Sequence, residues 1–202
     1  DCLVVHLTLV PFLAVTGELK TKPTQHSVKA LQESGVQPDI LVCRTEHKLP
    51  KEVRNKIALF CNVPQNAVIE SIDAETIYEV PLLMRKEKLD QVVIRRLKLS
   101  SGKTPDLSTW KEFVNRLKNP IDEVNIGLIG KYVELKDAYK SSEEAFVHLG
   151  STNELRVKVA WIHSEDLNAN NAGRILGKLD GILVAPGFGE RGIEGKVEAV
   201  QY

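Results

Sequence analysis

The chain has 202 residues, 27 basic against 27 acidic side chains, and a hydrophobic fraction of 43%. These values are typical of a soluble globular protein of one large or two small domains, and the balanced charge argues against nucleic acid as a partner. The hydrophobic start lacks the basic end of a signal peptide, and no hydrophobic run approaches the roughly 20 residues of a membrane span.

Strands and helices alternate over residues 1–99, which predicts an α/β domain with a mostly parallel sheet. The hydrophobic segment 3–10 is typical of a strand that is buried on both faces. Segments 39–43 and 67–72 are expected to form the next two strands. Helices are expected over residues 27–34, 49–61, 77–89 and 91–97.

A break in this pattern follows at residues 100–106, which are small, polar and turn-rich, as in a linker. An amphipathic helix is expected over residues 107–117. A second α/β series then begins, with strands expected at 124–129, 155–162 and 181–185, and helices at 137–149, 169–179 and 193–202.

The last expected helix has no strand after it, so we expect the chain to be part of a longer one. We therefore predict two incomplete α/β domains, each a mostly parallel sheet flanked by helices. They would span residues 1–99 and 123–202 and be joined by a linker of residues 100–122.

One segment between the first strand and the first helix favours a ligand site: Gly17-Glu18-Leu19-Lys20-Thr21-Lys22-Pro23-Thr24-Gln25-His26-Ser27. Lys20 and Lys22 lie just before the helix, and Pro23 suits a first helical turn. Thr24 and Ser27 are expected to cap free N–H groups there. A helix N-terminus beside two ammonium groups favours phosphate, although solvated surface lysines would have the same spacing.

Three other positions have both a plain and a functional interpretation. Lys56 lies on a helix of mixed polarity and is, taken alone, a solvent-facing lysine. Arg44 follows a strand, where open α/β sheets bind ligands, but loop arginines are common there. The Pro186-Gly187-Phe188-Gly189 turn also follows a strand, and its N–H groups could form an oxyanion hole or simply a tight turn.

The cysteines and histidines predict no metal site. Cys2, Cys43 and Cys61 have neither metal spacing nor the context of a catalytic nucleophile. Cys43 and Cys61 are expected to be buried hydrophobic residues in a reducing cytosol. The five histidines show no ligand spacing.

Several segments, in order along almost the whole chain, resemble the CTP synthase family, whose members use glutamine to aminate UTP in pyrimidine biosynthesis. They are residues 6–11, 17–27, 37–44, 56–63, 126–132, 137–141 and 186–192. The resemblance implies that residues 1–99 end a P-loop-like ATP-dependent synthetase (amidoligase) domain. It also implies that residues 123–202 begin a class I glutamine amidotransferase domain.

The resemblance assigns residues to four ligands. UTP or CTP would be bound by Lys20, Thr21, Lys22, Pro23, Thr24, Gln25 and Lys56. ATP would be bound by Arg44, Ile72, Asp73 and Ala74, with backbone contacts at Ile72, where family members often carry a basic residue. Gly187 would contact glutamine and its oxyanion, and Arg191, Gly192 and Glu194 would belong to a loop linked to activation by GTP.

The resemblance also implies a cytoplasmic homotetramer that uses ATP with Mg²⁺, is inhibited by CTP and is activated by GTP. It places the phosphate-binding loop, the Mg²⁺ ligands and the glutaminase nucleophile outside these residues. No catalytic residue or metal ligand is therefore assigned, and the chain alone is expected to be inactive. Two alternatives stay open: a non-catalytic nucleotide-binding or assembly module, and an amidoligase with another acceptor.

Overall fold

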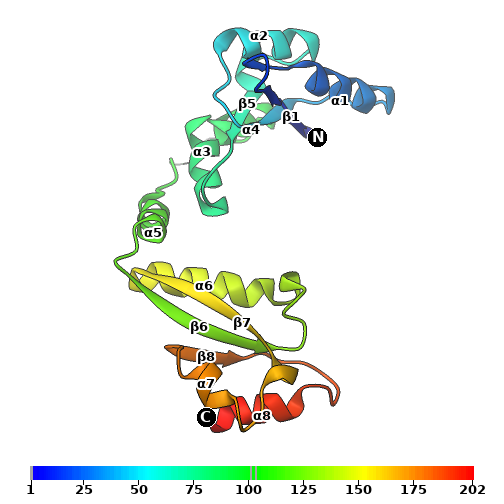
Figure 1. Cartoon of the computed structure of the whole chain (residues 1–202). Coiled ribbons are helices and arrows are strands. Elements are labelled where there is room, and N and C mark those ends of the chain that lie inside the picture. Colours follow the sequence, from blue (N-terminus) through cyan, green and yellow to red (C-terminus); the bar gives the residue numbers. More distant parts are fainter. Residues whose placement is uncertain (1, 101, 103) are drawn as a thin grey trace. The chain divides into compact units, whose positions relative to one another are not determined.

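The computed structural model describes all residues except 1, 101 and 103. It divides into two compact units, residues 1–107 and 108–202, each with a three-stranded parallel sheet flanked by helices (Figure 1). The predicted α/β class is therefore confirmed. Within the described residues, no helix has the length and hydrophobicity needed to cross a membrane.

The sheet of the first unit has the strand order β1-β4-β5, and both pairings are parallel. Its strands are β1 (Val5–Leu9), β4 (Ile40–Thr45) and β5 (Val68–Ile72). Its helices are α1 (Lys22–Glu33), α2 (Lys51–Phe60), α3 (Val80–Lys86) and α4 (Leu89–Arg96), with the short 3-10 helices η1 (Gln65–Ala67) and η2 (Ile77–Glu79). A two-stranded hairpin, β2 (Phe12–Leu13) and β3 (Glu18–Leu19), connects β1 to α1.

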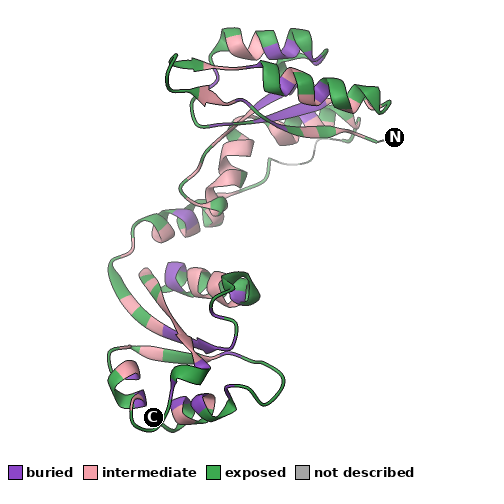
Figure 2. Cartoon of the chain, turned by 45° about the vertical axis from the view of Figure 1, so that its right-hand side comes forward, coloured by how far each residue is buried: buried purple, intermediate pink, exposed green. Residues whose placement is uncertain are grey.

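The first sheet has a hydrophobic cluster on each face. Leu41 and Cys43 of β4 pack with residues of α1 and α2, whereas Ile40 and Val42 pack with Val92 of α4. This division follows from the strand geometry, since successive side chains point to opposite faces. Buried residues accordingly gather in the sheet and on the helix sides that face it (Figure 2).

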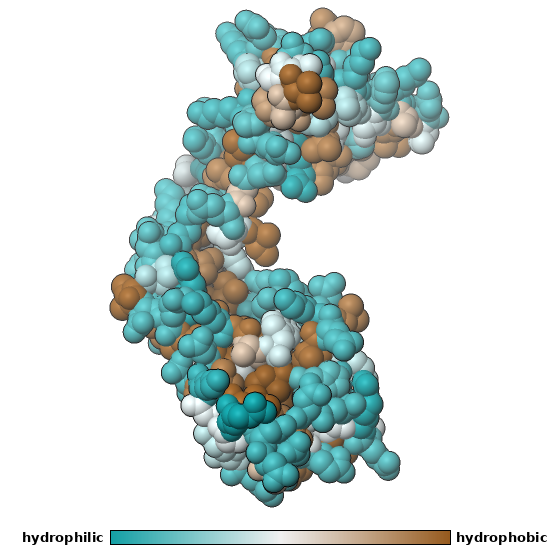
Figure 3. Space-filling view, viewed as in Figure 1, coloured by the Kyte–Doolittle hydropathy of each residue, from teal (hydrophilic) through white to brown (hydrophobic). Residues whose placement is uncertain are grey.

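Strand β1 is not buried on both faces as its sequence predicted. Within the described residues it pairs only with β4, and Val5, Leu7 and Leu9 are 45%, 61% and 56% exposed. The hydrophobic run did not distinguish a central strand from an edge strand, because both can consist of the same residue types. Hydrophilic residues cover most of the visible surface, with smaller hydrophobic patches between them (Figure 3).

The two buried cysteines give a chemical test of the first unit. Burial raises the pKa of Cys43 to about 12 and that of Cys61 to about 11, whereas Cys2 is exposed. We expect a thiol reagent at pH 8 to modify Cys2 quickly and the other two only after denaturation, because the thiolate is the reactive form. Mass spectrometry over time would measure this, and rapid modification of all three in the native chain would contradict the fold.

The second unit has the parallel strand order β7-β6-β8. Its strands are β6 (Asp122–Gly130), β7 (Leu155–His163) and β8 (Gly181–Val184). Its helices are α5 (Ser108–Lys118), α6 (Lys140–Asn153), α7 (Ala172–Leu176) and α8 (Ile193–Gln201), with η3 (Lys136–Tyr139) and η4 (Ser164–Asp166). Residues of α7 and α8 pack with Ile129 of β6, and Phe146 of α6 packs in the cluster of Leu128 on the other face.

The amphipathic helix predicted over residues 107–117 is confirmed as α5, which packs against α6 through a 2.9 Å hydrogen bond from Ser151 Oγ to the Phe113 carbonyl. One segment of the second unit differs from the sequence-based expectation. The helix predicted over residues 169–179 is only Ala172–Leu176. Its expected first turn is replaced by hydrogen bonds that the backbone N–H groups of Asn168 and Asn170 donate to asparagine side-chain oxygens, and such bonds compete with helix formation.

Candidate functional site

The hairpin between β1 and α1 sets the position of Lys20. The hairpin turns at Gly17, whose φ of 65° lies in the left-handed region that glycine adopts without strain. Lys20 follows β3 directly, and its backbone N–H donates to the Pro11 carbonyl at 2.9 Å. Lys20 is therefore held just ahead of the first helical residue.

Helix α1 begins at Lys22 rather than at the predicted Ser27, so Lys22 belongs to the first turn. The prediction of Pro23 in the first turn is confirmed. Thr21 is the N-cap residue, and its side chain makes no capping hydrogen bond. The N-terminus of α1 therefore has no side-chain cap, which leaves its N–H groups suited to an anion.

The predicted capping by Thr24 and Ser27 is wrong, because both hydroxyls bond to β1 instead. Thr24 is fully buried, and its Oγ1 donates to the Leu9 carbonyl at 2.9 Å. Ser27 Oγ lies 2.8 Å from His6 Nε2. These two bonds fix the start of α1 against the carboxyl end of β1.

The carboxylate of Glu18 lies beside Lys20 and is influenced by the charge of Lys56. Lys20 Nζ lies 2.5 Å from Glu18 Oε2. The pKa of Glu18 is lowered chiefly by this contact with Lys20 and to a smaller extent by the charge of Lys56 on α2. The structure thus places Lys20 in contact with Glu18, a neighbour that we had not singled out.

The other predicted UTP residues lie on the first turns of α1. Gln25 Nε2 donates to Thr21 Oγ1 at 3.0 Å, and Thr21 is 6% exposed. Lys22 and Pro23 are exposed. In the part of the chain that the structure describes, Lys22 has no ion-pair partner, so its ammonium group is available to a ligand.

The predicted ATP residues meet at the carboxyl ends of β4 and β5. Arg44 Nη2 lies 3.1 Å from Asp73 Oδ1, and the Asp73 N–H donates to the Thr45 carbonyl at 3.0 Å. Ile72 ends β5, and Ala74 is half-buried beyond it. Both side chains of the Arg44–Asp73 pair are more than half exposed, so a ligand could separate them at little cost.

Among the described residues, no three His, Cys, Asp or Glu side chains cluster closely enough to form a protein cage for a metal ion. We therefore assign no metal ligand and no step through Mg²⁺ to these residues.

The turn after β8 is held by two lysines that the sequence interpretation missed. Lys131, at the end of β6, donates from Nζ to the carbonyls of Phe188 at 2.5 Å and Gly189 at 2.9 Å. Lys196 Nζ of α8 donates to the Ala185 carbonyl at 2.8 Å. The only sequence signal was position, because Lys131 directly follows a buried strand whose carboxyl end lies at the same sheet edge as the turn. Gly187, the predicted glutamine contact, is exposed.

Arg191 and Lys131 line a cavity of about 630 Å³ in the second unit. Arg191 Nε lies 3.0 Å from Glu165 Oε1, and its guanidinium lies 5.8 Å from the centre of the Tyr132 ring. Gly192 has a φ of 73°, and a Cβ at this position would lie 2.2 Å from Ser164 Oγ. Of the three predicted GTP-loop residues, the structure places Arg191 at the cavity, whereas Gly192 shapes the turn. Glu194 lies in the first turn of α8 and does not line the cavity.

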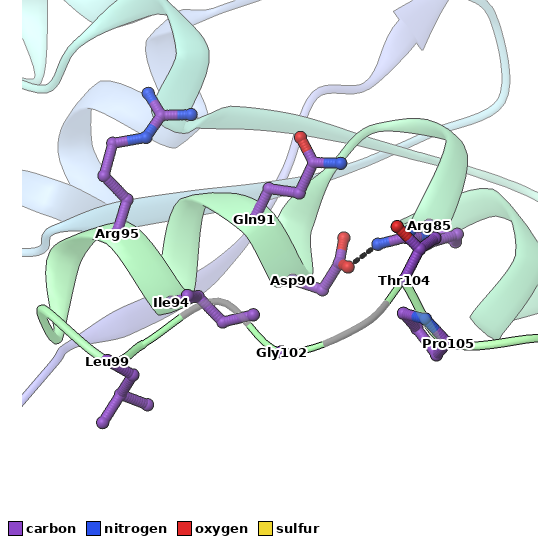
Figure 4. Close-up of a pocket in the computed structure, with 9 residues that line it drawn as sticks. All are labelled: Arg85, Asp90, Gln91, Ile94, Arg95, Leu99, Gly102, Thr104 and Pro105. Atoms are coloured by element: carbon purple, nitrogen blue, oxygen red, sulfur yellow. Dashed lines mark ion pairs between the residues drawn. The ribbon is translucent and has the colours of Figure 1, made fainter.

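A second cavity, of about 530 Å³, lies in the first unit beside α3 and α4 (Figure 4). Its described lining includes the ion pair of Arg85 and Asp90 together with Ile94 and Leu99. None of the predicted site residues lines it, so it adds nothing to the nucleotide or glutamine sites.

Comparison with known proteins identifies both parts of the chain. Residues 1–99 match the sequence profile of the CTP synthase N-terminus, and residues 134–202 match that of the class I glutamine amidotransferases. The chain is 67% identical over 202 residues to a CTP synthase of Cytophaga hutchinsonii, which covers all of this chain and 38% of that protein.

Two other relatives give the same result. The chain is 64% identical to a CTP synthase of Flavobacterium johnsoniae, over 99% of this chain and 37% of that protein. It is 56% identical to a CTP synthase of Carboxydothermus hydrogenoformans, over 100% of this chain and 38% of that protein. The chain thus spans a little over a third of the length of these relatives. It matches them from end to end, carries both profiles in order, and belongs to the CTP synthase family.

Proposed function

We propose that this chain supplies the pyrimidine-nucleotide contacts and part of the glutamine site of an enzyme that aminates UTP to CTP. The observation that carries the proposal is the contact of Lys20 with Glu18 beside the uncapped N-terminus of α1. The charge of Lys56 also lowers the pKa of Glu18. The end-to-end identity with proteins named CTP synthase supports the choice of UTP as the ligand.

The triphosphate would lie against Lys20, Lys22 and Lys56. Three ammonium groups and the first N–H groups of a helix offset several negative charges without a protein-bound metal. The triphosphate would take the place of the Glu18 carboxylate on Lys20, since both are anions that need the same donor. The Gln25 amide and the backbone of Thr21–Thr24 would complete the contacts of UTP, or of CTP as an inhibitor.

ATP would bind at Arg44 and Asp73, with backbone contacts at Ile72 and Ala74. Both proposed nucleotide sites lie at the carboxyl edge of the first sheet: the N–H of Val10, just after β1, donates to the Arg44 carbonyl at 2.8 Å. In the reaction, the γ-phosphate of ATP is transferred to the 4-oxygen of uracil. Ammonia then adds at C4 and expels phosphate, which yields CTP, ADP and phosphate.

The ammonia would come from glutamine bound at Gly187, whose N–H suits the carboxamide oxygen. GTP, as activator, would use Arg191 and the neighbouring cavity, with Gly192 and Glu194 forming the loop. No cysteine in residues 1–202 has a Gly-x-Cys-x-Gly context, and no Gly-rich loop ending in Gly-Lys follows a strand. Because the chain lacks these motifs and spans 38% of a relative's length, we propose that it acts within a longer protein and is inactive by itself. The family resemblance supports a cytoplasmic homotetramer as that protein.

The experiment expresses the full-length protein that contains this chain and measures CTP formation from UTP and ATP·Mg²⁺. We expect CTP with either glutamine or ammonium chloride, one ADP per CTP, and no CTP from residues 1–202 alone. Nucleotide binding without turnover would favour a non-catalytic module instead. Turnover with an acceptor other than UTP would favour a different amidoligase.

A further inference from the structure

Two ammonium groups hold the turn of residues 185–189 without any acidic partner. Lys131 Nζ contacts the Phe188 and Gly189 carbonyls, and Lys196 Nζ contacts the Ala185 carbonyl. Within the described part of the chain, neither lysine takes part in an ion pair. Lys131 is only 4% exposed, so its charge is largely removed from water.

This arrangement is costly if its role is only to fill space. A buried cation loses its hydration, and neutral carbonyls replace that hydration only in part. Burial and the neighbouring charge of Lys131 lower the pKa of Lys196. The charged form of Lys196 is therefore disfavoured at this position, as expected for a cation that loses hydration. Methionine would fill a similar volume without this penalty, so the charges themselves call for an explanation.

The hydrogen bonds from Lys131 determine where two amide groups of the turn point. In a trans peptide the N–H lies opposite the carbonyl oxygen of the same unit. Because the Phe188 and Gly189 carbonyls face Lys131, the N–H groups of Gly189 and Glu190 point away from it. Without the ammonium groups, each of these peptide units could rotate, and Gly189, at a φ of 80°, offers little resistance.

The same two side chains pass directly beside Gly187. A Cβ built at Gly187 would lie 3.2 Å from Lys196 Nζ and 3.4 Å from Lys131 Cδ. A ligand oxygen bound at Gly187 would therefore experience positive charge from close range. Charge placed in advance where an oxyanion develops is an effective way to lower an activation barrier.

We propose that Lys131 and Lys196 are positioning residues of the glutamine-hydrolysing site. They hold the backbone of the 185–189 turn, with the Gly189 and Glu190 N–H groups directed away from Lys131, and they place two positive charges beside Gly187. Negative charge that develops on the glutamine carboxamide oxygen is thereby stabilised. This inference rests on the proposed function, and it adds to it two residues and a role for their charge.

The test uses the full-length protein with Lys196→Met, which keeps the length of the side chain and removes its charge. We expect kcat for glutamine hydrolysis to fall about 10- to 100-fold while KM for glutamine changes less than about threefold. Lys131→Met should act in the same direction. Lys196→Arg should recover much of the loss, because it keeps the charge and the donors. Lys178→Met, at an exposed lysine in the same unit, is the matched control and should hydrolyse glutamine normally.

CTP formation from ammonium chloride bypasses glutamine and should be unchanged in Lys196→Met. Normal glutamine hydrolysis in this variant would overturn the inference alone, as would an arginine variant as slow as the methionine variant. Equal loss of glutamine- and ammonia-dependent CTP synthesis would indicate that Lys196 is needed for folding, and this result would also overturn the inference. Absence of glutamine hydrolysis in the unsubstituted protein would instead overturn the proposed function itself.

Discussion

Replacing Lys20 and Lys56 together by alanine is expected to weaken UTP binding to the full-length protein by about 100-fold. Each substitution removes a charge-assisted bond to phosphate of about 1.5 kcal/mol, and 1.4 kcal/mol corresponds to a tenfold change in affinity. Titration calorimetry with UTP would measure the loss. Ammonia-dependent kcat at saturating UTP should change only a few-fold, because the lysines are proposed to contact the phosphates and not the reacting ring.

Two controls fix the interpretation of that result. Glu18→Gln should strengthen UTP binding about two- to fivefold, because it removes an exposed anion that occupies Lys20 in the absence of the nucleotide. Lys29→Ala, at an exposed lysine on α1, should leave UTP affinity unchanged. Unchanged UTP affinity in the double lysine variant, or weaker UTP binding in Glu18→Gln, would show that Lys20, Lys56 and Glu18 do not belong to the UTP site.

Replacing Gly195 by alanine is expected to lower the free energy of unfolding of the second unit by about 3 kcal/mol or more. A Cβ at Gly195 would lie 1.7 Å from the Ser164 carbonyl oxygen and 3.0 Å from that of Leu167. Both atoms belong to the backbone and have little freedom to move. Helix α8 would therefore have to shift away from η4, which is costly in a well-packed region.

Tryptophan fluorescence in urea can measure this effect selectively. Both tryptophans of the chain, Trp110 and Trp161, lie in the second unit. Gly173→Ala on α7 is the matched control, because its added methyl meets only Tyr202, at an ordinary contact distance of 3.6 Å. The control should change stability by no more than about 1 kcal/mol. Equal unfolding midpoints for the two variants would contradict the packing of α8 against η4.

The sequence predicted most elements of the fold because its local patterns were strong. Strand β4 and helix α2 follow from hydrophobic runs and helical spacing. The start of α1 was missed because Thr24 and Ser27 were assigned to local capping, whereas their hydroxyls bond to β1. Leu59 and Phe60 of α2 are large hydrophobic residues, yet they are 78% and 62% exposed. Which hydrophobic residues are covered depends on neighbours that a local pattern does not contain.

The candidate site residues likewise divide into those that local spacing suggested and those that depend on tertiary packing. Lys20 and Lys22 lie within one short segment ahead of a helix, so their spacing alone suggested a phosphate site. Gln25 and Lys56 joined them only through the family resemblance, because the effect of Lys56 on Glu18 depends on the packing of α2. The contacts of Lys131 and Lys196 with the 185–189 turn could not be predicted, since Lys131 and Phe188 are 57 residues apart in the sequence. The sequence shows that Lys131 is positively charged, but its contact with the turn depends on how the sheet edge folds.

A structure of the full-length protein with UTP bound would show directly whether the triphosphate lies against Lys20 and Lys56. We expect phosphate oxygens within hydrogen-bonding distance of Lys20 and Lys56, at the first turn of α1, with Glu18 displaced from Lys20. A triphosphate bound elsewhere, with the Lys20–Glu18 contact still intact, would contradict this expectation.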